Sequence, residues 1–271
     1  MLYLIATPIG NLSDITFRAI DVLKGAHLIL CEDTRRSSIL LTHYKIEKPL
    51  LSYHKFNEQK QVEPILDRLR EGEIIALLSD AGTPCLNDPG SILIQACIRE
   101  KISFTSIPGP CSPINALLLS GFDAARFQFI GFLPKNPTET LKSIFGYPGT
   151  TIAFDSPERL IKTIQIICKL DSKRKIAVVR EMTKKFEECQ RGTAENLLTY
   201  FTEKGVKGEI CILIEGHLFS NEEMDVNELV ELLQEYHGLQ LKDAIKMAAK
   251  LLKKSKSEVY RTVHSIDLFR N

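Results

Sequence analysis

The feature that most constrains the fold of this 271-residue chain is a series of short, continuous apolar runs in its first half. They occupy residues 2–6, 26–31, 73–78 and 104–107. Continuous rather than alternating apolarity is typical of strands buried on both faces, as in parallel sheets. Helical patterns separate the runs, at residues 15–24, 36–43, 58–71 and 91–100. Strands that alternate with helices predict an α/β fold with right-handed crossovers.

The second half predicts another α/β unit and a helical tail. Strands are expected at residues 127–132, 151–154, 175–179 and 209–214, with helices at 157–170 and 193–204. Residues 132–149, which carry three prolines, are expected to form a linker. Two amphipathic helices, 221–236 and 241–253, precede a capping-box pattern at Ser255–Glu258 that opens a third helix through Phe269. The predicted domains are therefore an N-terminal α/β domain (1–117), a second α/β domain (118–218) and a small helical domain (219–271).

Composition excludes several classes of protein. The formal net charge is only +1, so any contact with nucleic acid must use local positive charge. Seven scattered cysteines without a C-x-x-C pair predict reduced, mostly buried thiols and no metal site. No run approaches the roughly 18 apolar residues of a membrane span, and the apolar N-terminus is too short for a signal peptide. We therefore expect a cytoplasmic protein that does not contact membranes.

Three turns rich in Pro, Gly, Asp or Asn follow the predicted strands, at residues 7–11, 79–84 and 108–112. Ligands of open α/β sheets bind at the carboxyl ends of strands, so these turns predict one shared crevice. The chain has neither G-x-G-x-x-G nor a Walker A pattern, which disfavours NAD, FAD and ATP and excludes a Rossmann dehydrogenase. Pro8 also removes a backbone donor from the first turn. This composition suits a ligand without a pyrophosphate, such as S-adenosylmethionine.

Two polar residues in these turns have alternative interpretations. Asp80 is either a turn-former or helix cap, or a carboxylate that accepts hydrogen bonds from a ligand. Ser112 is either the N-cap of the next helix or a hydroxyl that faces the crevice.

Several motifs, occurring in order, resemble those of the tetrapyrrole methylase superfamily. They are Leu4–Thr16 (LIATPIGNLSDIT), Cys31–Arg35 (CEDTR), Tyr53–Glu58 (YHKFNE), Leu78–Pro84 (LSDAGTP), Asp88–Gly90 (DPG) and Ile107–Pro110 (IPGP). Within that superfamily they are similar to the branch that methylates a cytidine 2′-hydroxyl in the decoding centre of 16S rRNA. The resemblance covers residues 1 to about 216, and the tail resembles the small helical domain of that branch.

The resemblance implies two α/β domains with S-adenosylmethionine in the cleft between them, S-adenosylhomocysteine as a product, and no metal. It implies a homodimer whose substrate is 16S rRNA, within the 30S subunit. Nine residues fall on the cofactor-contacting positions: Pro8, Asp80, Gly82, Thr83, Cys111, Ser112, Phe154, Asp155 and Met182. Cys111 departs from the serine usual in that branch, a nearly isosteric change.

Methyl transfer to a ribose hydroxyl requires in-line alignment and benefits from a base or a cation near the oxygen. One branch-specific motif supplies Glu32, Asp33 and Arg35, and the other supplies His54, Asn57 and Glu58. Of these, the four catalytic candidates are Asp33, Arg35, His54 and Asn57. His54 is a base near neutral pH or a side chain that packs at the surface. Asp33 and Arg35 pair with each other, or Arg35 contacts an RNA phosphate.

The tail is a second candidate for RNA contact. Residues 238–271 carry eight basic and three acidic side chains, a local net charge of +5. The predicted RNA-binding residues are Lys250, Lys253, Lys254, Lys256 and Arg261, in a helix-turn-helix-like arrangement. The alternative is a solvated basic face above an apolar packing stripe that includes Ala244, Ile245 and Ala248.

The favoured function is an S-adenosylmethionine-dependent RNA 2′-O-methyltransferase. Two alternatives are a methyltransferase acting on a tetrapyrrole or similar small molecule, and a non-catalytic RNA-binding or assembly protein. The basic tail and the motifs at 31–35 and 53–58 argue against the small-molecule enzyme. Asp80 and the Pro-Gly-Pro turn argue, through the resemblance, against loss of the cofactor.

Overall fold

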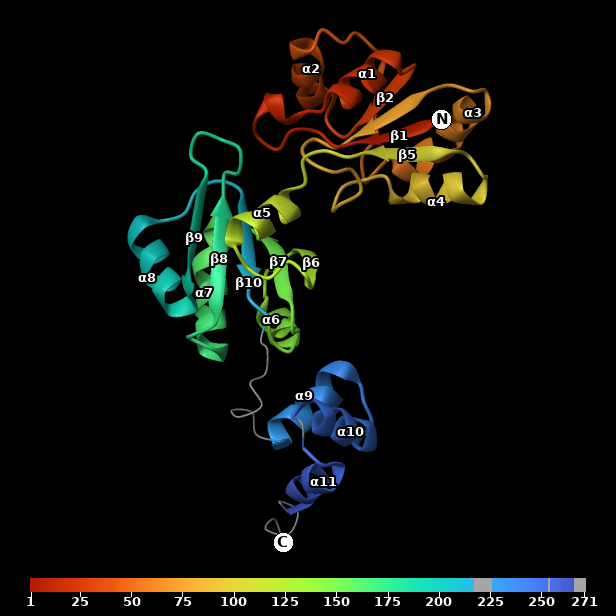
Figure 1. The fold of residues 1–271 in the computed structure, drawn as a ribbon. Coiled ribbons are helices and arrows are strands. Elements are labelled where there is room, and N and C mark those ends of the chain that lie inside the picture. Colours follow the sequence, from red (N-terminus) through yellow and green to blue (C-terminus); the bar gives the residue numbers. More distant parts are fainter. Residues whose placement is uncertain (217–225, 253, 266–271) are drawn as a thin grey trace.

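The computed structural model describes residues 1–216, 226–252 and 254–265. Figure 1 shows two α/β units, each built on its own five-stranded sheet, and a group of three helices near the C-terminus. The predicted α/β class is confirmed.

The first sheet is entirely parallel, as the continuous apolar runs predict. Its order is β3-β2-β4-β1-β5. The strands are β1 (Leu2–Ile5), β2 (Leu28–Cys31), β3 (Leu50–Ser52), β4 (Ile75–Leu78) and β5 (Phe104–Ile107). The sequence reading missed β3, because this three-residue strand at the sheet edge is only half buried and has no extended apolar run.

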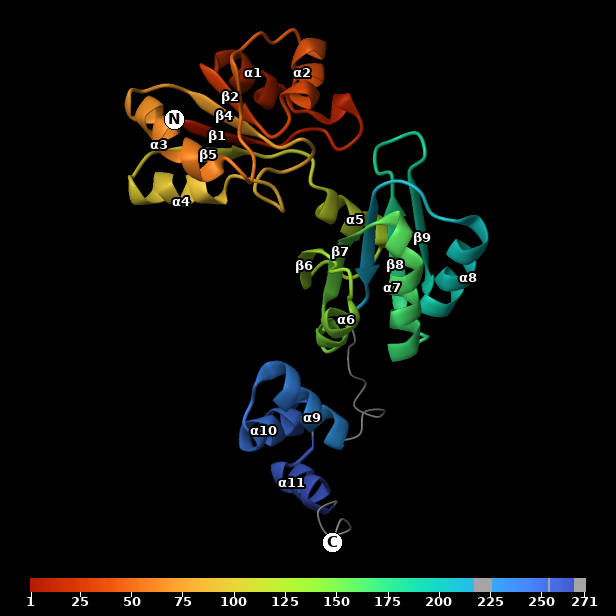
Figure 2. The ribbon, with the colours of Figure 1, turned by 180° about the vertical axis from the view of Figure 1, so that it is seen from behind.

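Helices cover both faces of this sheet (Figures 1 and 2). They are α1 (Phe17–Gly25) and α2 (Thr34–His43) on one face, and α3 (Glu58–Arg70) and α4 (Ser91–Arg99) on the other. Successive strand residues point to opposite faces, so Leu4 packs with α3 and α4 while Ile5 packs with α1 and α2. Because all five strands are parallel, their carboxyl ends lie at the same edge of the sheet.

The second sheet is mixed and has the order β6-β7-β10-β8-β9. Its strands are β6 (Phe127–Phe132), β7 (Thr150–Asp155), β8 (Lys175–Arg180), β9 (Glu188–Thr193) and β10 (Ile210–Ile214). Only the β6–β7 pair is parallel. The sequence reading missed β9, because its residues ECQRGT are polar and none of them is fully buried.

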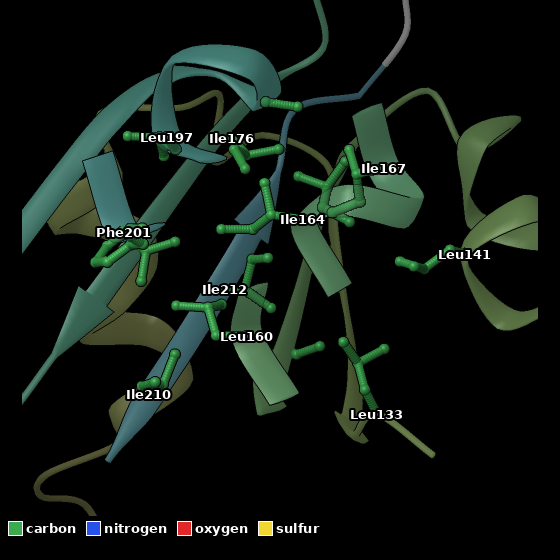
Figure 3. Packing of buried hydrophobic residues seen from close by; sticks show 14 of the residues in the cluster. Leu133, Leu141, Leu160, Ile164, Ile167, Ile176, Leu197, Phe201, Ile210 and Ile212 are labelled. Carbon is green, nitrogen blue, oxygen red and sulfur yellow. The ribbon is translucent and has the colours of Figure 1, made fainter. Parts of the chain in front are cut away.

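One face of the second sheet is covered by α6 (Thr138–Phe145), α7 (Pro157–Leu170) and α8 (Ala194–Lys204), as Figure 3 shows. Leu160, Ile164 and Phe201 are fully buried there, each contributing about 1.5–3 kcal/mol of burial free energy. The expected linker at residues 132–149 instead contains α6, whose Leu141 and Ile144 are buried in this core.

The opposite face of the second sheet is covered by α5 (Ser112–Ser120), which packs against β8 and β10. Ala116 and Leu117 share a buried cluster with Ile152 of β7. The boundary between the first and second α/β domains, placed between residues 117 and 118, remains a prediction; it falls within this helix.

The three C-terminal helices pack on one another. They are α9 (Val226–His237), α10 (Leu241–Leu251) and α11 (Lys256–Ser265). Leu229, Ile245 and Val259 lie in their common core. The Ser255 hydroxyl accepts a hydrogen bond from the Glu258 backbone N–H (3.2 Å), which confirms the predicted N-cap of α11. The predicted helix limits at 221 and Phe269 lie outside the described residues.

The seven cysteines are free thiols, of which Cys31, Cys97 and Cys211 are buried and the other four half-buried. Within residues 1–216, 226–252 and 254–265, no helix combines the length and hydrophobicity that a bilayer span needs.

Candidate active site

The three turns that the sequence predicts to share a crevice are joined by hydrogen bonds. Thr7 and Gly82 exchange both backbone N–H···O bonds at 2.9 Å. The Thr83 hydroxyl donates to the Pro110 carbonyl at 3.1 Å. Gly82 has φ +82°, a backbone conformation that favours glycine. The turns after β1, β4 and β5 therefore form one continuous wall.

A cleft of about 390 Å³ lies between this wall and the second α/β unit. The first unit contributes the turn after β4 and residues Ile9, Glu32 and Arg36, and the second contributes the ends of β6, β7 and β10. Its volume lies within the range of about 300–1,000 Å³ usual for small-molecule sites.

Most of the predicted cofactor residues lie on this cleft. Its lining includes Asp80, Gly82, Thr83, Ser112, Phe154, Asp155 and Met182. Pro8 and Cys111 are not in the lining; both are half-buried beside it. Cys111 is the N-cap residue of α5, so the alternative that assigned this cap to Ser112 is wrong, and Ser112 instead faces the cleft.

Asp155 lines the cleft, but both oxygens of its carboxylate are already bonded to neighbouring residues. The Thr163 hydroxyl donates to Oδ2 at 2.6 Å, and Arg159 forms an ion pair with Oδ1 at 3.0 Å. The Ser156 N–H also donates to Oδ1, at 2.8 Å. These bonds fix the start of α7 against β7, so the carboxylate acts as a structural group.

An aromatic surface lies beside Asp155. The Phe154 ring packs against Phe129 and Phe132, with ring centroids 5.0 and 5.1 Å apart. Phe132 also lines the cleft and is 64% exposed. This wall suits the flat, apolar face of a nucleoside base.

The opposite wall of the cleft is acidic. Three carboxyl groups, Glu32, Asp80 and Asp88, belong to its lining, where Arg36 is the one basic side chain among the residues that the structure describes. Burial, followed by the negative charges of Glu32 and Asp80, raises the pKa of Asp88 to about 6. Asp80 is held in place because its Oδ1 accepts the Asp33 N–H at 3.0 Å, while Arg36 lies 3.5 Å from Oδ2. Such a wall attracts a cation and repels a phosphate.

A second pocket of about 600 Å³ adjoins this cleft, and Glu32, Arg36 and Asp80 line both. Three of the four catalytic candidates, Asp33, Arg35 and His54, lie on the second pocket. The cleft and the pocket thus meet at a junction made of two carboxylates and a guanidinium.

Asp33 and Arg35 form an ion pair with each other, which is the first of the two alternatives given for them by the sequence. Arg35 donates from Nε and Nη2 to the two carboxylate oxygens of Asp33, at 3.1 and 2.8 Å. Asp33 also caps α2 by accepting the Arg35 N–H at 2.9 Å. These bonds lower the pKa of Asp33 to about 2, which makes this carboxylate a weak base.

Asn57 lies outside the lining, because its side chain organises the turn after β3. Its Oδ1 accepts the His54 N–H at 2.8 Å, and its Nδ2 donates to the Ser52 carbonyl at 2.9 Å. His54 lies on the pocket, and its Nδ1 is buried without a hydrogen-bond partner among the described residues.

Sequence reasoning overlooked three side chains that the fold brings to the site: Arg36, Asp88 and Phe56. Asp88 belongs to the Asp-Pro-Gly motif and Phe56 to the Tyr-His-Lys-Phe motif. Their membership of these motifs is the one feature of the sequence that could have identified them as site residues. Among the described residues, no group of three or more His, Cys, Asp or Glu side chains is arranged to hold a metal ion.

Comparison with known proteins gives a consistent result. Residues 1–198 match the model of the tetrapyrrole (corrin/porphyrin) methylases. A ribosomal RNA small subunit methyltransferase I from Halalkalibacterium halodurans is 39% identical over 275 residues, covering 97% of this chain and 94% of the relative. The protein of the same name from Thermotoga maritima is 42% identical over 217 residues, covering 79% of this chain and 98% of the relative.

Solved structures share the fold of the two α/β units. A cobalt precorrin-4 methyltransferase superposes with a TM-score of 0.58 at 21% identity, covering 79% of this chain and 94% of that chain. From the family match and the relatives' identity over most of its length, the chain belongs to the tetrapyrrole (corrin/porphyrin) methylase family.

Proposed function

We propose that this protein transfers a methyl group from S-adenosylmethionine to the ribose 2′-hydroxyl of a cytidine in the decoding centre of 16S rRNA, releasing S-adenosylhomocysteine. The observation that carries the proposal is the similarity to relatives named ribosomal RNA small subunit methyltransferase I, which extends over 97% of the chain. The proposed substrate is this RNA within the 30S subunit, in the cytoplasm, and the proposed assembly is a homodimer.

The cleft fits S-adenosylmethionine by charge and shape. A cation without phosphates suits the wall formed by Glu32, Asp80 and Asp88. The aromatic wall at Phe132 and Phe154 suits the adenine ring. When bound, this cofactor supplies a methyl group on a positively charged sulfur.

The junction of the two pockets supplies the remaining chemistry. There the side chains of Glu32, Asp80 and Arg36 lie on the boundary between the cofactor cleft and the second pocket. A carboxylate accepts the proton of the acceptor hydroxyl, and the Arg36 guanidinium stabilises the negative charge that develops on the oxygen. Asp80 is bonded to Asp33 and faces Arg36, so we assign proton acceptance to Glu32.

The test is transfer of labelled methyl from S-adenosylmethionine to 30S subunits that lack the modification, with the product mapped by nuclease digestion and mass spectrometry. We expect one 2′-O-methylcytidine in the decoding region. Glu32→Gln should lower kcat by about 10²–10⁴-fold, the usual contribution of a general base, and should weaken cofactor binding by a much smaller factor, because Asp80 and Asp88 remain in the acidic wall. Glu203→Gln, at an exposed position on α8, is the matched control.

Other outcomes identify the alternatives. Tight cofactor binding without transfer to 30S subunits, combined with transfer to a tetrapyrrole, would indicate a small-molecule methyltransferase. Absence of cofactor binding in calorimetry would indicate a non-catalytic protein.

A further inference from the structure

Phe56 is a large apolar side chain in an unusual position. It is 92% exposed and lies on the turn between β3 and α3, in the lining of the second pocket. A single exposed apolar residue on a protein surface needs no explanation. An exposed phenyl ring beside a pocket that opens into the cofactor cleft is different, because it offers a flat face next to the site of transfer.

The turn that carries Phe56 is held in place by several hydrogen bonds. The Asn57 side chain bonds to His54 N–H and to the Ser52 carbonyl, and the backbone N–H groups of Asn57 and Glu58 both donate to the His54 carbonyl at 2.9 Å. The His54 ring lies 6.1 Å from the Phe56 ring in an edge-on arrangement. The backbone under Phe56 is therefore fixed before any ligand arrives, which lowers the entropy cost of binding.

The charged side chains that share the pocket with this ring are three acidic and three basic ones, and two of the basic ones, Arg35 and Arg36, are paired with Asp33 and Asp80. Arg35, Arg36 and Lys55 line the same pocket, and the Arg35 and Arg36 side chains are 90% and 69% exposed. Lys55 is exposed and forms no ion pair with any of the described residues. An exposed aromatic face beside a lysine that has no ion pair among the described residues resembles the arrangement with which proteins bind single-stranded RNA.

We propose that Phe56 is the stacking platform for a base of the acceptor RNA strand, with Lys55 beside the neighbouring phosphate. This inference rests on the proposed function. The base occupies the second pocket, and its strand continues toward the junction at Glu32, Arg36 and Asp80, where the methyl group is transferred.

The length of one relative supports an RNA-binding surface within the α/β units. The Thermotoga maritima protein carries the same name, and its alignment of 217 residues covers 98% of it but only 79% of this chain. That length corresponds to the two α/β units here, residues 1–216, without room for the helical tail.

The absence of tryptophan from this chain makes the proposal directly measurable. Phe56→Trp introduces the only tryptophan of the chain at the platform, and stacking of a base on it should quench the tryptophan emission when unmodified 30S subunits are added. Phe17→Trp, at a phenyl ring 88% exposed on α1, is the matched control and should show little quenching. Equal emission changes in the two variants would overturn the proposal.

Substitution of the ring tests the same point through activity. Phe56→Leu keeps an apolar side chain but removes the aromatic face. It should lower kcat/KM for 30S subunits by about five- to 150-fold, the loss expected from stacking worth about 1–3 kcal/mol per base. Phe56→Trp should keep most of the activity, and cofactor affinity in calorimetry should be the same in both variants.

The failure of this inference is distinguishable from failure of the proposed function. If the wild-type protein methylates 30S subunits and Phe56→Leu does so with equal kcat/KM, the platform is disproved while the function stands. If the wild-type protein transfers no methyl group to 30S subunits, the function fails, and Phe56→Trp emission should then not respond to them.

Discussion

The carboxyl group of Asp88 lies where burial and two neighbouring carboxylates oppose its ionisation, which raises its pKa to about 6. A bound cation relieves this opposition, so protons and the cofactor compete for the site. We expect S-adenosylmethionine affinity to fall roughly three- to tenfold as the pH is lowered from 7.5 to 5, by linkage. Calorimetry across this range measures it, with Asp88→Asn as the comparison. An equally steep profile in that variant would contradict the assignment.

The same shift predicts the effect of Asp88 on stability. Its folded-state pKa of about 6 exceeds the unfolded value near 3.9, so the charged form is destabilised in the fold. The penalty is full above pH 6 and disappears below about pH 4. Asp88→Asn should therefore raise the free energy of unfolding at pH 7.5 by something of the order of 2 kcal/mol, and change it little near pH 4. Urea denaturation at both pH values tests this, and a gain of equal size at pH 4 would exclude an ionisation effect.

At the scale of elements, the turn after β1 fixes how closely the two units approach. A Cβ added to Gly10 would lie 2.9 Å from the Met182 carbonyl oxygen and 2.7 Å from the Thr183 hydroxyl. Met182 lines the proposed cofactor cleft, and the turn after β8 that carries it must move if Gly10 gains a side chain. The width of the cleft thus depends on a glycine that does not line it.

We expect Gly10→Ala to weaken cofactor binding by about tenfold or more, because a displacement of a few tenths of an ångström separates the two walls. Gly25→Ala is the matched control, since a Cβ there meets nothing within 4 Å and the residue ends α1. Calorimetric titration of both variants is the measurement. If Gly10→Ala and Gly25→Ala bind S-adenosylmethionine with equal affinity, the contact at Gly10 does not determine the width of the cleft.

At the scale of the whole molecule, opposite charges are separated. The proposed cofactor cleft is acidic, whereas Lys250, Lys254, Lys256 and Arg261 are exposed on α10, α11 and the turn between them. The fifth predicted RNA-binding residue, Lys253, lies outside the described residues. The net charge of +1 conceals this division. RNA contact by the tail remains a prediction.

Charge reversal tests that contact in the intact chain. Replacing Lys254, Lys256 and Arg261 together by Glu should weaken binding to 30S subunits and flatten its salt dependence by about 0.7–0.9 in slope per lost phosphate contact. Reversal of Lys162, Lys169 and Lys173, which are exposed on and after α7, is the control of equal charge. Filter binding across salt concentrations is suitable. Equal effects of the two sets would indicate only a response to net charge.

Much of the fold follows from local sequence. The continuous apolar runs predicted four strands of the first sheet, because burial on both faces requires apolar residues at every position. The prediction failed at β3, β9 and α6, which are short, polar or half-buried, so that the deciding contacts come from elsewhere in the chain. The antiparallel pairing of the second sheet likewise has no local signature.

The sequence by itself determined the family, through ordered motifs, and it disfavoured ligands with a pyrophosphate, through the missing phosphate-binding glycines. Only the tertiary structure decided what each side chain of those motifs does. In the folded chain, the side chains of Asp155 and Asn57 form hydrogen bonds that hold the local structure, and Asp33 pairs with Arg35. Burial raises the pKa of Asp88, and Phe56 is left exposed. The physical reason is that strength as a base, availability for bonding and exposure depend on neighbours in space. Those neighbours come from loops and strands far apart along the chain.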